Sequence, residues 1–578
     1  MFNKTFSWFN RKFNLGELDL WPIFVFQAII IYLNRNFIPI WDSTIYTNWC
    51  IYPAITADNF VLRRFDCFGH VSHLFSLLVG GVLYYSKFRY YNVHYMIGFL
   101  YILSTWSFYK ILCFYLNFNK NDSKYRLEIF LGTILYAFCP VIWAMIFNLN
   151  LDIGILLFSV LFFYALTYQR KWQALIYASL LIFSKAIGIF IFIVILFSYV
   201  VGNFFELKFG KDKSTIKDIL KNFINQFYPL VLPVIALAWH YIHISSKKDL
   251  PGWGSILVSK FSFSSIITIA LNFNLNDVRL KSFLANIFVL NFSWMLWGII
   301  AFVLIKILVL NKIFKNNKNN DNNKNNVNKK ITKVAEVKAV NYFISLSILL
   351  GMVYVTTRFL TFNNPRYNAV VLPYLIITTI LSIVLMSKTR WPRTSILSIL
   401  CVIIISSNLW TIDPLSKKVY GTFEYGKHSM LNMTSITNDC CGKGRDQLLY
   451  NMQYLFIQNL LYQLYDYLID DVYHGGNITA GDPIFTNDHA LFPFHFGLNI
   501  YRKLVLWKGA NWELPIYAGV GDIDKITKEK NKNTFYYLSY PNYYDEENFK
   551  ILNANYKLKA SKTFDNYGYT CTLYTYAL

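Results

Sequence analysis

The chain has 578 residues, of which 55% are hydrophobic, 19% are aromatic and only 15% are charged. It is too long and too apolar for a single soluble domain, and its repeated apolar runs have the length, about 20 residues, of a bilayer-crossing α-helix. We therefore predict an α-helical polytopic membrane protein.

The formal net charge of +23 belongs to the apolar part of the chain. Residues 413–578 carry 16 Lys and Arg against 17 Asp and Glu, so residues 1–412 carry 39 against 15. These basic residues lie in short loops between apolar runs, as the positive-inside rule requires. They predict cytoplasmic loops, and we expect no nucleic acid among the partners. The eight cysteines form no CxxC pair, so no zinc site is predicted.

The first apolar run follows a basic stretch without a small-residue cleavage site, and it predicts an uncleaved first span with a cytoplasmic N-terminus. A first external loop is expected over 35–70, and residues 70–85 are expected to lie along the outer surface as a helix. Alternation between basic and non-basic loops then predicts about 11 spans. After the first, they are 95–117, 127–148, 153–168, two short crossings between 173 and 206, 225–244, 283–310, 339–357, 368–386 and 394–410.

The segment LLIFSKAIGIFIFIVILF (180–197) contains one charged residue, Lys185. A charge at the bilayer centre costs about 2.5–3.5 kcal/mol on insertion scales. The basic loops YQRKWQ and ELKFGK flank this apolar stretch, and both are expected on the cytoplasmic side. One straight helix would place them on opposite sides. We therefore predict two short crossings with an external turn at 184–188, which puts Lys185 at the outer rim.

Two further parts of the chain differ in composition from the spans. Residues 311–338 contain an Asn/Lys-rich tract that predicts a disordered cytoplasmic loop. Residues 413–578 predict a small extracytoplasmic α/β domain after the membrane domain of residues 1–412. In that domain, 451–473 has the apolar periodicity of an amphipathic helix, and DPIFTND, NTFYYLSY and YGYTCTLYTYAL alternate as strands do.

Several polar residues fall on the predicted outer side. Asp42 lies in IPIWDSTIYTNW, Asp152 in FNLNLDIGILLF, and Lys185 in the external turn. His240 ends an apolar run, and Arg366 and Tyr367 lie in NNPRYNAVVLPYL. Carboxylates beside cations at a membrane rim suit a phosphate-bearing lipid, because Arg and Lys bind phosphate oxygens and a carboxylate can accept a proton from an attacking hydroxyl.

Four motifs in this order, WD-x3-Y, an Asp that opens a later span, SK-x2-G and PRY-x5-P, resemble those of the GT-C glycosyltransferases. The resemblance covers residues 20–410 and is nearest to the aminoarabinose transferases, the RgtA/B/C/D-like group and the protein O-mannosyltransferases. The family's first loop usually reads Asp-Glu, whereas this chain has Asp42-Ser43, and its usual K-P-x-G is here Lys185-Ala-Ile-Gly. The lost acidic residue puts metal binding through that motif in doubt.

The resemblance implies an enzyme that moves a sugar, with inversion, from a polyprenyl- or dolichyl-phosphate carrier to a lipid, glycan or protein acceptor. Asp42 would be the catalytic carboxylate, and Asp152 the second acidic residue of the site. Lys185 and Arg366 would hold the donor phosphate, and Tyr367 and His240 would support them. No metal ligand is assigned and no cofactor is certain, with a divalent metal left open. The active site would face outward from a bacterial inner membrane or into the endoplasmic reticulum.

Each of these residues also has a purely structural interpretation. Asp42 could cap a helix, Lys185 could extend to the lipid interface, and Arg366 could anchor its span in the headgroups. Two other functions also remain open, a transporter or flippase of lipid-linked glycans and a glycan polymerase or ligase. A transporter is expected to place its charges at the membrane midplane between repeats, whereas these charges are predicted at one face.

Overall fold

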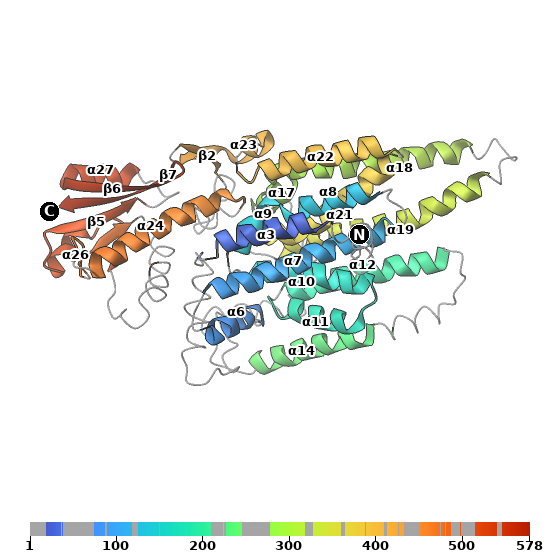
Figure 1. The fold of residues 1–578 in the computed structure, drawn as a ribbon, viewed down its shortest axis with the longest axis horizontal. Coiled ribbons are helices and arrows are strands. Elements are labelled where there is room, and N and C mark those ends of the chain that lie inside the picture. The colour runs from blue at the N-terminus through green and yellow to red at the C-terminus, as the bar shows by residue number, and fades with distance from the viewer. Residues whose placement is uncertain are drawn as a thin grey trace, which may run out of the picture.

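We describe the protein from a computed structural model. The described residues are 19–35, 37, 74–86, 90–117, 125–148, 151–185, 187–209, 224, 227–245, 278–317, 327–359, 365–387, 389–409, 413–425, 427–432, 450–473, 476–479, 481–486, 498, 515–539 and 546–578. They form a long bundle of helices with a small α/β domain at one end (Figure 1).

The bundle contains mostly apolar helices, several of them interrupted. Its elements are α3 (Trp21–Leu33), α6 (Leu74–Tyr85), α7 (Tyr90–Tyr115), α8 (Arg126–Ala137), α9 (Pro140–Ile146), α10 (Leu151–Thr167), α11 (Lys171–Ile182), α12 (Gly188–Phe209), η3 (Tyr228–Leu230), α14 (Val231–Ser245), α17 (Val278–Phe288), η4 (Leu290–Phe292), α18 (Ser293–Asn317), α19 (Val327–Phe359), α20 (Pro365–Asn368), η5 (Ala369–Val371), α21 (Leu372–Met386) and α22 (Arg390–Ser406).

Within the described part of the chain, five helices are long and apolar enough to cross a membrane. A sixth is added if α8 and α9, which meet at an angle of 49°, count as one span, and three shorter apolar helices accompany them. The structure therefore supports a polytopic membrane protein, and the count of about 11 spans stays a prediction.

Helix α10 lies at the centre of the bundle. All 17 of its residues are buried, and it packs against α7, α11 and α12. A helix that is apolar on every side lies either in lipid or in a protein core, and the burial of every α10 residue shows that it lies in the core. Its first turn therefore begins inside the protein, and this is where Asp152 lies.

The loop expected over 311–338 is shorter in the structure. Helix α18 continues to Asn317 and α19 begins at Val327, so only 318–326 lie outside the described residues. The difference has a local cause, because the Lys, Ala and Glu residues in this stretch favour helix and extend the neighbouring spans. Figure 1 shows these two helix ends pointing away from the C-terminal domain.

The C-terminal domain is a three-layer α/β unit. Its elements are α23 (Pro414–Tyr420), β1 (Thr422–Tyr425), β2 (His428–Leu431), α24 (Gln453–Tyr473), β3 (Ile484–Thr486), β4 (Ile516–Ala518), α26 (Ile523–Glu529), β5 (Thr534–Ser539), α27 (Glu546–Asn555), β6 (Lys557–Asn566) and β7 (Tyr569–Ala577). The five-stranded sheet has the order β4-β3-β5-β7-β6, and β3 pairs in parallel with β4 and β5, whereas β7 pairs antiparallel with β5 and β6.

Residues of β5 alternate between the two faces of this sheet. Phe535 and Tyr537 pack with Ile523 of α26 and Leu552 of α27, whereas Leu538 belongs to the core cluster shared with α24 and the bundle.

The predicted helix at 451–473 and the three predicted strands are all present in this domain. The extracytoplasmic position of the domain stays a prediction.

One buried carboxylate joins this domain to the bundle. Asp413 caps α23 by accepting hydrogen bonds from the backbone N–H groups of Leu415 (3.0 Å) and Ser416 (3.2 Å). It also accepts bonds from the Phe292 N–H (2.8 Å) and the Trp294 indole N–H (3.2 Å) at the interruption between α17 and α18. The C-terminal domain therefore holds this helix interruption directly.

Candidate active site

Three of the predicted site residues meet at the N-terminal end of α10. The Lys185 Nζ lies 2.8 Å from Asp152 Oδ1, and the Arg366 Nε lies 3.5 Å from Asp152 Oδ2. Each carboxylate oxygen therefore faces a different cation. The side chains are largely removed from solvent, with exposures of 9% for Asp152, 12% for Lys185 and 4% for Arg366. Together the three groups carry one net positive charge.

Tyr367 packs against both cations. Its ring centroid lies 4.5 Å from the Lys185 Nζ and 4.8 Å from the Arg366 Cζ. Its hydroxyl accepts a hydrogen bond of 3.0 Å from the Arg366 Nη2. A cation over an aromatic ring in a desolvated place gains electrostatic stabilisation from the ring. Tyr367 therefore belongs to the site as a partner of the two cations.

The turn that carries Lys185 has a specific requirement for glycine. The Gly188 N–H donates to the Lys185 carbonyl (2.8 Å), which closes the turn between α11 and α12. A Cβ at Gly188 would lie 2.1 Å from the Leu181 carbonyl oxygen, a backbone atom that cannot move aside independently. The predicted break at 184–188 is thus present, and the close approach explains why the SK-x2-G motif ends in glycine.

Helix α6 packs against the same turn. The Leu74 N–H donates to the Phe183 carbonyl (2.8 Å), and Phe75 stacks edge-on against Phe158 of α10 with ring centroids 6.3 Å apart. Phe75 is completely buried. The helix predicted at 70–85 therefore braces the Lys185 turn against α10.

Arg366 and Tyr367 lie on α20, a single helical turn that opens the helix α20–η5–α21. Pro365 occupies the first helical position, where its missing N–H and fixed φ favour a helix start. All four residues of α20 are buried. This short turn delivers the guanidinium of Arg366 to Asp152 of α10.

The two remaining predicted residues are not placed in this group. Asp42 lies outside the described residues. His240 lies in α14, which packs against α11, and its side chain is outside the described part of the structure. The nearest described residue before Asp42 is Phe37, whose ring lies 5.6 Å from that of Phe147, at the end of α9.

Two residues without a predicted role line a cavity next to α20. Asn368 follows Tyr367 directly on α20, and Ser293 opens α18. Both line a cavity and are buried, with exposures of 4% and 3%. No motif pointed to them, because their shared position depends on two helix interruptions and the start of α20, which meet only in the folded chain. Across the described residues, no group of three or more His, Cys, Asp and Glu side chains is arranged to hold a metal ion.

No protein-family profile and no curated protein matches this chain. Among solved structures, it is similar to ArnT from Cupriavidus metallidurans bound to undecaprenyl phosphate, with a TM-score of 0.46 and 9% identity. It is also similar to ArnT from that organism in the apo state, with a TM-score of 0.47 and 10% identity. Each alignment covers 95% of this chain and 97% of the other. Both TM-scores are below 0.5, so the roles proposed below rest only on contacts within this chain.

Proposed function

We propose that the protein is an integral membrane glycosyltransferase that uses a polyprenyl-phosphate sugar as donor. The observation that carries the proposal is the buried group of Asp152, Lys185 and Arg366 at the start of α10. Two cations held by one carboxylate leave a net positive charge, which suits a phosphate. Arg binds phosphate oxygens through its planar fork and Lys binds them as a point charge.

The arrangement of the bundle supports a site on the extracytoplasmic side. The ends of α18 and α19 that flank the basic tract point away from the C-terminal domain (Figure 1). Phe37, at the other end of the bundle, packs against both Phe147 near the site and Tyr462 of α24, with ring centroids 5.6 Å apart in each case. Basic loops favour the cytoplasm, so the end that carries the site and the C-terminal domain would face outward.

In the proposed reaction, an acceptor hydroxyl attacks the anomeric carbon of the donor sugar. The new bond joins the acceptor oxygen to that carbon, and the bond between the carbon and the phosphate oxygen breaks with inversion. Asp42 takes the hydroxyl proton, and the polyprenyl phosphate leaves as an anion. Lys185 and Arg366 stabilise the charge that develops on the phosphate.

The geometry favours a positioning role for Asp152. Both of its oxygens contact cations that would bind the phosphate, so the carboxylate orients Lys185 and Arg366. Tyr367 fixes the same two groups through its ring and hydroxyl. His240 would support the residues that bind the donor phosphate. A turnover assay identifies the sugar, for example mannose, and the acceptor, which is a lipid, a glycan or a protein.

The test is turnover by purified full-length protein with labelled mannosyl, glucosyl and aminoarabinosyl polyprenyl phosphates and crude membrane acceptors. We expect transfer by the wild type, loss of transfer in Asp42→Asn, and a raised donor KM in Lys185→Met. Lys306→Met is a matched control, because Lys306 lies on α18 and its Nζ contacts the Met386 carbonyl, outside the site. Wild-type activity that survives Lys185→Met unchanged would remove the lysine from the donor site.

The same preparation separates the other two functions. Reconstituted protein that moves a lipid-linked glycan between leaflets without any transfer would indicate a flippase. Products that grow by repeated addition of lipid-linked glycans would indicate a polymerase. Either result would refute the single-sugar transferase.

A further inference from the structure

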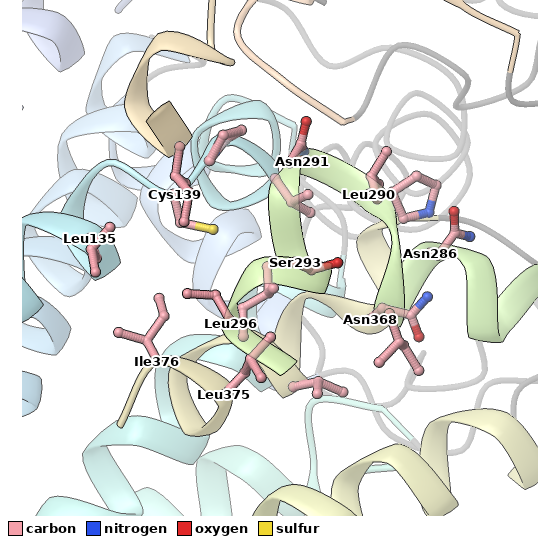
Figure 2. Close-up of a pocket in the computed structure, with 17 residues that line it drawn as sticks. Leu135, Cys139, Asn286, Leu290, Asn291, Ser293, Leu296, Asn368, Leu375 and Ile376 are labelled. Atoms are coloured by element: carbon pink, nitrogen blue, oxygen red, sulfur yellow. The ribbon is translucent and has the colours of Figure 1, made fainter. Parts of the chain in front are cut away.

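A cavity lies beside α20, where two helix interruptions meet the start of the helix that α20, η5 and α21 form. Its walls come from the α8–α9 break, the α17–η4–α18 break and the first turns of the α20–η5–α21 helix. Figure 2 shows Asn286, Ser293 and Asn368 on one side of it and the apolar side chains of Leu135 and Ile376 on the other. The cavity thus has a polar end and an apolar end.

The polar end contains hydrogen-bonding atoms without partners. Within the described residues, neither the Oδ1 nor the Nδ2 atom of Asn368 makes a hydrogen bond, and nor does the Ser293 Oγ. Both residues line the cavity and more than nine-tenths of each is buried. Buried polar groups are almost always hydrogen-bonded in native proteins. A donor, an acceptor and a hydroxyl left open toward one cavity therefore indicate an occupant.

The lining determines the chemistry of that occupant. Among the residues that the structure describes, none that lines the cavity is Asp, Glu, Lys, Arg or His, so a charged group would lose its solvation without gaining a counter-ion from them. The cavity volume is about 30 Å³, enough for one or two groups the size of water. A side-chain amide can accept from a hydroxyl and donate to another oxygen at the same time. These properties suit a neutral hydroxyl group on a less polar ring or chain.

The cavity is lined by a residue that lies close in sequence to the proposed phosphate-binding residue Arg366. Asn368 follows Arg366 by two residues on one helical turn, so the two side chains leave α20 in different directions. The cavity wall also includes Asn291, whose Nδ2 donates to the Tyr450 carbonyl in the C-terminal domain (2.5 Å). The cavity therefore borders both the helical turn that carries Arg366 and the junction with that domain.

We infer that this cavity is a subsite for a neutral hydroxyl group of a sugar, bound by Asn368 and Ser293. The inference rests on the proposed function, since it deepens that function by naming an uncharged sugar as a substrate. The hydroxyl could belong to the donor sugar or to a sugar on the acceptor. Both sources offer the same chemistry, and binding measurements separate them.

The experiment compares lipids that differ only in the presence of a sugar. Purified full-length protein is titrated with polyprenyl phosphate, glucosyl polyprenyl phosphate, diacylglycerol and glucosyl diacylglycerol, and the Tm is followed by tryptophan fluorescence. The concentration dependence of Tm gives a Kd for each lipid. The gain in affinity on adding the sugar is then compared between wild type and variants.

We expect Asn368→Leu to lose the gain due to the sugar, with binding of the sugar-bearing lipid weakened roughly tenfold or more, because a buried hydroxyl would lack its partner. Binding of bare polyprenyl phosphate should stay unchanged. Asn341→Leu is the matched control, since Asn341 is a buried asparagine on α19 whose Nδ2 donates to the Tyr115 carbonyl (3.1 Å). Ser293→Ala provides a second variant should Asn368→Leu fail to fold.

A loss confined to the polyprenyl pair assigns the subsite to the donor sugar, and a loss confined to the diacylglycerol pair assigns it to the acceptor. If Asn368→Leu and Ser293→Ala keep the gain for both pairs, or the wild type shows none, the cavity holds only water and the inference is overturned. If bare polyprenyl phosphate fails to bind while the sugar gain persists and depends on Asn368, the proposed phosphate site fails and the subsite stands.

Discussion

Replacing the carboxylate between the two cations is the most direct test of the site. In Asp152→Asn, the Lys185 Nζ and the Arg366 Nε lose a charge that lies 2.8 Å and 3.5 Å away. At an effective dielectric constant near 20, these contacts correspond to gross attractions of about 6 and about 5 kcal/mol. Desolvation of the groups opposes most of this gain. Removing one member of a buried pair costs a net of about 3–5 kcal/mol in measured cases.

We therefore expect Asp152→Asn to lower the free energy of unfolding by about 3–5 kcal/mol. The double variant Asp152→Asn/Lys185→Met should recover part of the loss, because it leaves one cation instead of two. Asp19→Asn is the control, since Asp19 pairs with Arg126 at 2.5 Å but the two side chains are 26% and 49% exposed. A partly exposed pair of this kind contributes about 0.2–1 kcal/mol.

The assay is unfolding of the purified protein in mixed micelles, followed by circular dichroism, with and without polyprenyl phosphate. In Asp152→Asn, the added phosphate should restore part of the lost stability, because the anion replaces the missing charge between Lys185 and Arg366. A cost below about 1 kcal/mol would show that the carboxylate does not hold the two cations together, since that is the range of an exposed pair. A phosphate effect equal to that in the wild type would refute the placement of the anion.

Three further predictions follow from the structure. Gly188→Ala should displace the Lys185 turn, because the new Cβ would meet the Leu181 carbonyl oxygen at 2.1 Å. The rate of sugar transfer should then fall by a larger factor than the folding equilibrium constant. Equal transfer rates for Gly188→Ala and the wild type would contradict this. Glu128→Gln should cost about 3–5 kcal/mol of unfolding free energy, because it removes the negative charge that lies 2.8 Å from Arg393, a side chain only 2% exposed. Glu128→Leu/Arg393→Leu should be more stable than Glu128→Gln, and a less stable double variant would argue against the pair. Burial, with a smaller effect of nearby Asp482, raises the pKa of Tyr536 to about 12. The folded domain thus keeps this proton, whereas the unfolded chain releases it from about pH 10. The free energy of unfolding should therefore fall between pH 10 and 12, and it should fall less in Tyr536→Phe. Identical pH profiles of unfolding for the two proteins would refute the raised pKa.

Much of the architecture could be predicted because its signals are local. Apolar runs, basic loops and the alternation of strands lie in short stretches, and the helix at 453–473, the strands β3, β5 and β7 and the break after Ile182 all occur as predicted. The segments 127–148 and 283–310 were each predicted as one continuous span, yet both are interrupted, whereas 368–386 lies in one continuous apolar helix, Pro365–Met386. The second break contains Asn291 and Phe292 with φ of 52° and 62°, a conformation that Asp413 stabilises from 121 residues away along the chain.

For the site as well, some features could be predicted from the sequence and others depend on the fold. The sequence alone determined that Asp152, Lys185 and Arg366 lie at segment ends, because charged residues are expelled from apolar runs toward their boundaries; Tyr367 followed from its place beside Arg366 in the PRY-x5-P motif. Asp42 and His240 stay predictions from the motifs. Only the tertiary structure decided that the carboxylate lies between the two cations, and that Asn368 and Ser293 face a shared cavity. Contacts between α10, α11 and α20 depend on how whole helices pack, and helix packing is set by side chains spread over the entire bundle.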